Sequence, residues 1–299
     1  MEGSGASATG AVQVDFDLRP VTIRTDDRTL LSQGDGDTVT IDQPVRMVSI
    51  DTPEKSRYAG SPAISQPKLD RCRERLEAGF LPEIPDAMAQ YLAARITPDA
   101  AARHIGAANR ATEELGAALT ERLALPGEDT KRRRLAVMPT GAFLDEEARL
   151  LAYLAPWYTK AELPPRDDPR RETFNLGQIR SGWGAFFPIY PSLPRDADMN
   201  MAIEAARTAW ETPLGARAEF GEDVMPGYEY RMCIKLGGQP MEPDAKALTD
   251  AAFRRLCVDL RDMRMRGRFD WADVPEWARL WIWQEDREEA VERLGVVGA

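Results

Sequence analysis

The sequence predicts an α+β protein, because segments with strand spacing and segments with helix spacing follow one another along the chain. Apolar residues alternate with polar ones in 12–23 and again in 39–50, the period of a half-buried strand. Residues 105–123 instead carry an apolar stripe at spacings of three, four and seven. No apolar run is long enough to span a membrane, so no membrane partner is expected.

The first half of the chain is expected to hold a meander of short strands, an insertion and a long helix. Thr97 is the predicted N-cap of that helix, with Pro98 at its first position, and Pro126-Gly127 ends it. Before it, 55–96 is rich in proline and charge and is interpreted as an insertion with short helices. The predicted strands are 12–23, 39–41 and 45–50, followed by 135–138 and 149–154.

The second half is expected to mix helices with one strand. Residues 157–172 are predicted to form a surface loop, 174–181 a short helix closed by Gly182, and 196–214 a longer helix. Apolar residues alternate with charged ones from Tyr228 to Leu236, which predicts a half-buried strand. An amphipathic helix is predicted over 243–264, and a tryptophan-rich region follows at 271–283.

Charge and the supply of cysteine and histidine exclude several classes of site. The 299 residues carry a net charge of −10, so nucleic acid could be bound only through a local basic site. Three cysteines without CxxC spacing indicate neither a zinc site nor a disulfide framework, and a reducing cytoplasm is the expected compartment. The single histidine, His104, excludes a poly-histidine metal site.

The most informative segment for chemistry is 35–54, where acidic residues gather around one arginine. It contains Asp35-Gly36-Asp37-Thr38, then Arg46, then Asp51-Thr52-Pro53-Glu54. Carboxylates and a backbone carbonyl are the oxygens that a hard divalent cation binds. An arginine beside that cation would be repelled unless an anion such as phosphate lay between them. The pattern therefore indicates a site for a metal and a phosphate.

These motifs resemble the staphylococcal nuclease (thermonuclease) family. The order is DGDT, an arginine five residues before DTPE, and then Asp145 to Tyr153, which is similar to the family segment D-x-x-x-R-x-L-A-Y. The resemblance extends over 12–216, with insertions near 56–96 and 155–172. It implies a five-stranded OB-fold β-barrel with packed helices. Around that domain we expect a flexible tail at 1–11 and a small C-terminal α+β region at 217–299.

The resemblance also implies a role for each matching residue. Asp37 and Asp51 would supply carboxylates to one Ca²⁺, and Thr52 would supply its backbone carbonyl. Glu54 would orient or deprotonate the attacking water, while Arg46 and Arg149 would hold the scissile phosphate.

Basic and aromatic residues outside these motifs are candidates for substrate binding. Tyr190 lies where the family stacks a nucleobase. Lys131, Arg132 and Arg133 could contact phosphates, although a solvated charge run explains them equally well. Counted along a continuous strand, Arg46 and Asp51 would point to opposite faces, so only a bend could bring them together.

The function expected from the resemblance is a Ca²⁺-dependent nuclease that leaves 3′-phosphates on DNA or RNA. Glu146 and Glu147 replace the family's lysine and tyrosine, which weakens attraction to a polyanion and leaves the substrate open. One alternative is a catalytically silent module whose tryptophan-rich region docks a protein partner or a second copy. Another is an enzyme of the same fold that acts on small phosphodiesters.

Overall fold

The computed structural model describes residues 28–34, 36–55, 58, 60–165, 168–238 and 244–298. The tail expected at 1–11 and the strands expected over 12–23 lie outside these ranges. The chain divides into two compact units, 1–43 and 44–299. Within the described residues, no helix combines the length and apolar character needed to cross a lipid bilayer.

The described part of the first unit is a hairpin of two antiparallel strands. Leu30 pairs with Ile41 and Gln33 with Val39, and the chain turns between the strands at Gly36 and Asp37. All residues of both strands are exposed. The strand predicted at 39–41 is confirmed. The strands of this unit are β1 (Leu30–Gln33) and β2 (Val39–Ile41).

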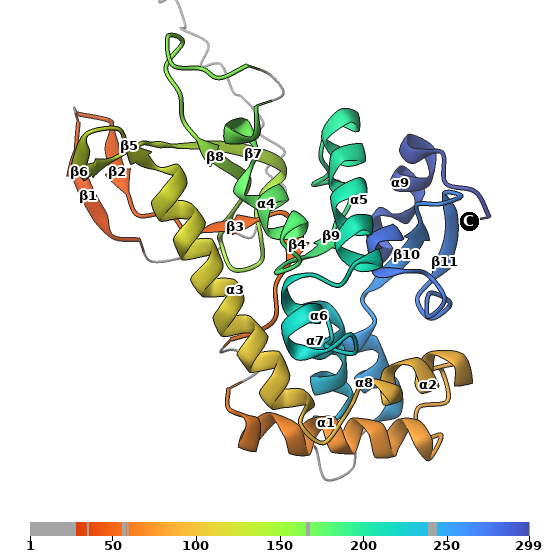
Figure 1. Cartoon of the computed structure of the whole chain (residues 1–299). Helices are drawn as coiled ribbons and strands as arrows, with labels where there is room; N and C mark the ends of the chain where they lie inside the picture. Colours follow the sequence, from red (N-terminus) through yellow and green to blue (C-terminus); the bar gives the residue numbers. More distant parts are fainter. Residues whose placement is uncertain are drawn as a thin grey trace, which may run out of the picture. The chain divides into compact units, whose positions relative to one another are not determined.

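Three helices follow the first two strands of the second unit (Figure 1), and the first two of them lie within 55–96, where helices were predicted. Helix α3 begins after Asp99 and buries a stripe of small side chains, including Ala101 and Ala108. A helix in this region was predicted, but the N-cap is Asp99 and not Thr97, so the helix starts two residues later than expected. The helices are α1 (Pro62–Glu77), α2 (Asp86–Ala94) and α3 (Ala100–Arg122).

Seven strands, two α-helices and one 3-10 helix of the described residues belong to the middle of this unit. Strand β8 lies between β3, which runs parallel to it, and β7, which runs antiparallel. Strand β4 pairs with β9, and β5 pairs with β6. The strands are β3 (Val45–Met47), β4 (Ser49–Asp51), β5 (Ala124–Leu125), β6 (Glu128–Arg132), β7 (Leu135–Leu144), β8 (Leu150–Pro156) and β9 (Ala185–Phe187). The helices are η1 (Pro169–Arg171), α4 (Phe174–Arg180) and α5 (Asp196–Glu211), as predicted for 174–181 and 196–214.

Two predictions for the last third of the chain are wrong. Tyr228–Leu236 lies in helix α7, not in a strand, and only part of 243–264 is helical. Strand β10 follows α8 within this range, and its buried residues Leu256 to Asp259 lie between β11 on one side and β12 on the other. The elements are α6 (Gly215–Phe220), α7 (Gly227–Leu236), α8 (Ala245–Ala252), β10 (Arg255–Asp259), β11 (Arg264–Gly267), η2 (Glu276–Ala278), β12 (Arg279–Trp283), η3 (Gln284–Asp286) and α9 (Arg287–Leu294).

The largest apolar core joins elements from both sides of residue 217. Helices α1, α2 and α7 pack together in it (Figure 1), with Phe187 of β9 and Trp281 of β12. Trp271 and Trp281 are buried there, in edge-to-face contact at 5.3 Å between ring centres. The segment expected as an accessory region therefore shares its core with the insertion helices.

The α+β class is confirmed, whereas the closed five-stranded barrel is not. In the described ranges the strands form sheets of two or three, and none of these sheets closes on itself. The strands expected over 12–23 are outside the described residues.

Candidate active site

A break between two strands brings Arg46 and Asp51 together. Strand β3 pairs with β8, but β4 pairs with β9, so the chain changes partner after Met47. Ser49 has a φ of 60°, a left-handed conformation that redirects the backbone. Arg46 Nη2 consequently lies 3.1 Å from Asp51 Oδ1. A continuous strand would place Arg46 and Asp51 on opposite faces, and this bend at Ser49 is what brings their side chains together.

Asp51 is buried and is held by two arginines. Its side chain is 1% exposed. Arg231 of helix α7 donates from Nη1 and Nη2 to Asp51 Oδ1, each at 3.0 Å. The other carboxylate oxygen, Oδ2, is buried without a hydrogen-bond partner among the described residues. The negative charge of Asp51 is therefore balanced by Arg46 and Arg231 on one of its two oxygens.

Glu54 is fixed through both its side chain and its backbone. Its Oε1 accepts a hydrogen bond from Arg231 Nη1, and its backbone N–H donates to His104 Nε2 at 2.8 Å. His104 is 1% exposed and stacks on Tyr230 at 3.6 Å. Burial, opposed by Asp51, lowers the pKa of His104 to about 3. The imidazole is thus neutral at pH 7 and can accept the Glu54 hydrogen bond.

Arg149 lies at the end of a turn stabilised by Asp145. Asp145 Oδ1 accepts the backbone N–H groups of Glu147 and Arg149, at 2.9 Å and 3.0 Å. The Arg149 guanidinium pairs with Asp145 at 2.6 Å and with Glu147 at 3.1 Å, and it remains 35% exposed. The acidic residues of this turn therefore orient the arginine and leave part of it accessible to a ligand.

Arg46, Glu54 and Arg149 line one cavity with a volume of about 710 Å³. Its volume is in the range of small-molecule sites. Tyr190 also lines it but is only 5% exposed and packs in an apolar cluster, so little of its ring is open for stacking. The predicted site residues that line the cavity are Arg46, Thr52, Glu54, Arg149 and Tyr190.

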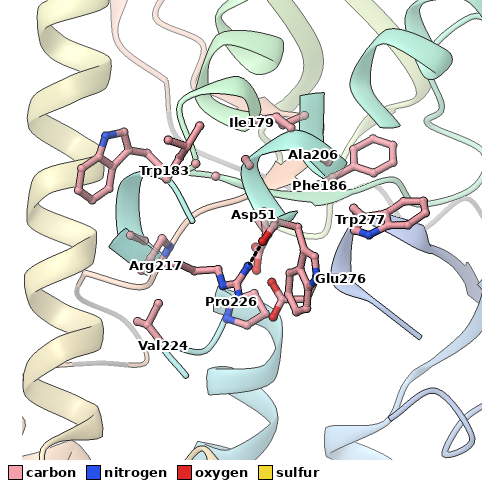
Figure 2. A pocket seen from close by; sticks show the side chains of 18 of the residues that line it. Asp51, Ile179, Trp183, Phe186, Ala206, Arg217, Val224, Pro226, Glu276 and Trp277 are labelled. Carbon is pink, nitrogen blue, oxygen red and sulfur yellow. Dashed lines mark hydrogen bonds between the residues drawn. The ribbon is translucent and has the colours of Figure 1, made fainter. Parts of the chain in front are cut away.

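Asp51 lines a second, smaller cavity and not the larger one. Figure 2 shows the smaller cavity, of about 60 Å³, in which Asp51 lies among mostly apolar side chains such as Ile179, Phe186 and Trp277. Arg46 and Arg231, its two partners, line the larger cavity. Asp51 is therefore linked to the larger cavity through these two arginines, which it holds by hydrogen bonds.

The remaining predicted residues lie elsewhere. Lys131 and Arg132 are on strand β6 and Arg133 follows it; none of the three lines the cavity. Lys131 lies 3.4 Å from Glu128, and Arg133 lies 3.4 Å from Glu162 and stacks on Tyr158. Asp37 belongs to the first compact unit, between β1 and β2.

The residues of the second unit do not make a calcium site as they are arranged. The described residues contain no group of three or more histidine, cysteine, aspartate or glutamate side chains that could hold a metal ion. Asp51 Oδ1 is taken by Arg46 and Arg231, and Arg231 also reaches Glu54. A guanidinium between the two carboxylates repels a divalent cation, so the residues in this arrangement do not fit a Ca²⁺ ion.

Sequence reasoning missed the basic residues that α7 and β10 contribute to the cavity. Because Tyr228–Leu236 forms a helix, Arg231 and Lys235 are one turn apart and both line the cavity. The signal was the presence of charged residues inside an otherwise apolar segment, since a buried charge needs a partner. The missed basic residues are Arg231 and Lys235 of α7, Arg255 of β10, Arg254 just before it, and Lys55, which follows β4.

Comparison with known proteins adds no relative. No protein-family model matches the chain, and searches of curated proteins and of solved structures give no match.

Proposed function

We propose that the chain is a nuclease that hydrolyses phosphodiester bonds of DNA or RNA in the larger cavity. The observation that carries this proposal is that Arg46 and Glu54, from the segment that holds β3 and β4, line the same space as Arg149, which lies about 100 residues further along the chain. Two partly exposed guanidiniums suit the oxygens of a phosphate, and a carboxylate beside them suits a water molecule. The OB-type barrel, a reducing cytoplasm and 3′-phosphate products belong to the same proposal.

In this proposal the chain's own residues carry the reaction. Arg46 and Arg149 bind the scissile phosphate and stabilise the charge that grows on its oxygens. Arg231 donates to Glu54 Oε1, so Oε2 is assigned to take the proton of the attacking water. The water oxygen bonds to phosphorus, the bond from phosphorus to the 5′ oxygen breaks, and solvent protonates that oxygen. Calcium dependence remains a prediction of the resemblance alone.

The test is cleavage of single- and double-stranded DNA and RNA with Ca²⁺, Mg²⁺ or EDTA. Glu54→Gln is expected to lower the cleavage rate by about 10²-fold to 10⁴-fold, and Arg46→Ala by at least about 10²-fold. Arg207→Ala is the control, because Arg207 is exposed on α5 and pairs with Glu204. Wild-type activity that survives in Glu54→Gln, or folded wild-type protein that cuts none of the substrates, would overturn the proposal.

A second candidate function is binding of a phosphorylated ligand without cleavage. It is favoured by Arg231, which pairs with both Asp51 and Glu54 and so lowers the availability of both carboxylates. The two candidates differ in the same assay, since a binding module retains an oligonucleotide but leaves it intact. A chromogenic small phosphodiester, included as a further substrate, tests the remaining alternative of small-molecule turnover.

A partner docked by the tryptophan-rich region has less support. Trp271 and Trp281 are buried in the core, which leaves Trp277 and Trp283 half-buried.

A further inference from the structure

One part of the larger cavity is lined by basic residues that come from after residue 217. Arg231 and Lys235 are four residues apart on α7, and Arg254 and Arg255 lie where β10 begins. The four come from elements different from those that carry Arg46, on β3, and Arg149, beside β8. The cavity therefore has basic residues beyond the pair assigned to the scissile phosphate.

Three of these basic residues already have partners. Arg231 pairs with Asp51 and Glu54. Arg254 lies 3.0 Å from Glu146, in a pair that is largely exposed. Lys235 Nζ donates to the backbone carbonyl of Ala251 at 3.0 Å, which leaves its charge unbalanced. Lys235 and Arg254 line the cavity while they make these contacts.

Arg255 is held in place but lacks a polar partner at one of its atoms. Its guanidinium stacks on the ring of Trp283 at 4.2 Å and on that of Phe187 at 5.2 Å. Its Nε is buried without a hydrogen-bond partner among the described residues. A buried donor without an acceptor is unfavourable, so the residues around Arg255 leave its hydrogen-bonding capacity incompletely used.

Burial and neighbouring positive charges lower the pKa values of both Arg255 and Lys235. Burial, then Arg231, lowers the pKa of Arg255 to about 9. Burial, then Arg254 and Arg255, lowers the pKa of Lys235 to about 8. An anion near both groups would reverse the repulsion among them.

We propose that Arg255 and Lys235, with Arg254 beside them, form a subsite for a second phosphate group, separate from the pair Arg46 and Arg149. A guanidinium whose plane is fixed by aromatic stacking is suited to the two oxygens of a phosphate. The identification of this second phosphate as a neighbour of the scissile phosphate rests on the proposed function. Binding of a phosphate group there does not depend on cleavage.

The test compares three thymidine dinucleotides in EDTA by calorimetry: one with no terminal phosphate, one with a 5′-phosphate and one with a 3′-phosphate. The proposal expects one of the added phosphates to tighten binding to the wild-type protein by about tenfold. Arg255→Gln and Lys235→Gln should each remove most of that gain, and Arg255→Lys should restore part of it. Arg207→Gln, which removes one exposed charge outside the cavity, should keep the gain in full.

The outcomes separate this subsite from the nuclease proposal. A gain that depends on Arg255 without cleavage of any substrate overturns the nuclease and keeps the subsite. Cleavage by a protein that binds all three dinucleotides equally overturns the subsite alone. A gain that persists unchanged in folded Arg255→Gln and Lys235→Gln proteins also overturns the subsite. If Arg255→Gln does not fold, Lys235→Gln decides.

Discussion

His104 gives the protein a pH-dependent stability that can be assigned to one side chain. It is the chain's single histidine, and burial lowers its pKa from 6.5 to about 3. Between these values the unfolded chain binds a proton that the folded chain refuses, so stability is present above pH 6.5 and is lost as the pH falls. The free energy of unfolding is expected to drop by about 2 kcal/mol from pH 7 to pH 5.

Urea denaturation at these two pH values measures that drop. His104→Gln removes the titration, so the same pH change should affect its stability much less. An equal drop in both proteins would contradict the assignment to His104.

Gly227 is needed because the candidate site lies directly against the start of α7. A Cβ at this position would lie 2.6 Å from Asp51 Oδ2 and would also collide with the Thr52 carbonyl. Gly227→Ala is therefore expected to lower the free energy of unfolding by about 2 kcal/mol. Gly116→Ala is the matched control: Gly116 lies within α3 with nothing near its Cβ position. That change should raise stability by up to about 1 kcal/mol.

Both changes are measured by urea denaturation of otherwise identical proteins. If Gly227→Ala were as stable as the wild type, helix α7 could not be packed against Asp51 as described.

At the scale of elements, α7 is anchored by a buried charge network. Glu229 is fully buried and accepts from Arg279, Arg95 and Tyr91 at 2.6–2.8 Å. Burial alone would raise the pKa of Glu229, but Arg95 and Arg279 lower it. Replacing Glu229 with a neutral residue leaves the buried guanidiniums of Arg95 and Arg279 without this carboxylate. Glu229→Gln is therefore expected to lower the free energy of unfolding by about 3–5 kcal/mol.

The control for this network is Glu204→Gln, which breaks an exposed pair with Arg207 on α5. Its unfolding midpoint should stay at the wild-type value, because solvent screens exposed pairs. Equal midpoints for Glu229→Gln and wild-type protein would contradict the anchoring role of Glu229.

The same helix explains where prediction from the sequence failed. In Tyr228–Leu236 apolar residues alternate with charged ones, as they would in a strand. Nearly every residue of α7 is buried, however, and Glu229 is buried through ion pairs with Arg95 and Arg279. A helix surrounded by protein has no solvent-facing side to reveal its period of 3.6 residues. Helix α3, which has an exposed face, was predicted correctly.

The sequence predicts those residues of the candidate site that belong to local motifs, but not those that reach it through tertiary packing. Arg46, Glu54 and Arg149 stand in motifs whose order along the chain is visible. Arg231 reaches Asp51 and Glu54 across 180 and 177 residues. Arg255 reaches the cavity only because β10 pairs with β12. Such contacts follow from tertiary packing, which local patterns do not encode.

At the scale of the whole molecule, the shared core predicts that 44–299 unfolds as one unit. Helices α1 and α2 pack against α7 and Trp271 in a single cluster. Truncation after residue 216 would expose the apolar faces of α1 and α2 to water. We expect the truncated chain to lose the cooperative urea transition of the full chain, followed by far-UV circular dichroism. A truncated chain that unfolds as cooperatively as the full chain would contradict a shared core.

The stacking of Arg255 on Trp283 also gives the protein an internal optical probe. Indole emission depends on nearby charge, and this ring has a guanidinium 4.2 Å from its centre. Neutralisation of that guanidinium by phosphate should shift the fluorescence of the protein during a titration. The Trp283→Phe protein should bind the same ligand with a much smaller signal. Occupancy of the cavity could then be followed in real time without any attached dye.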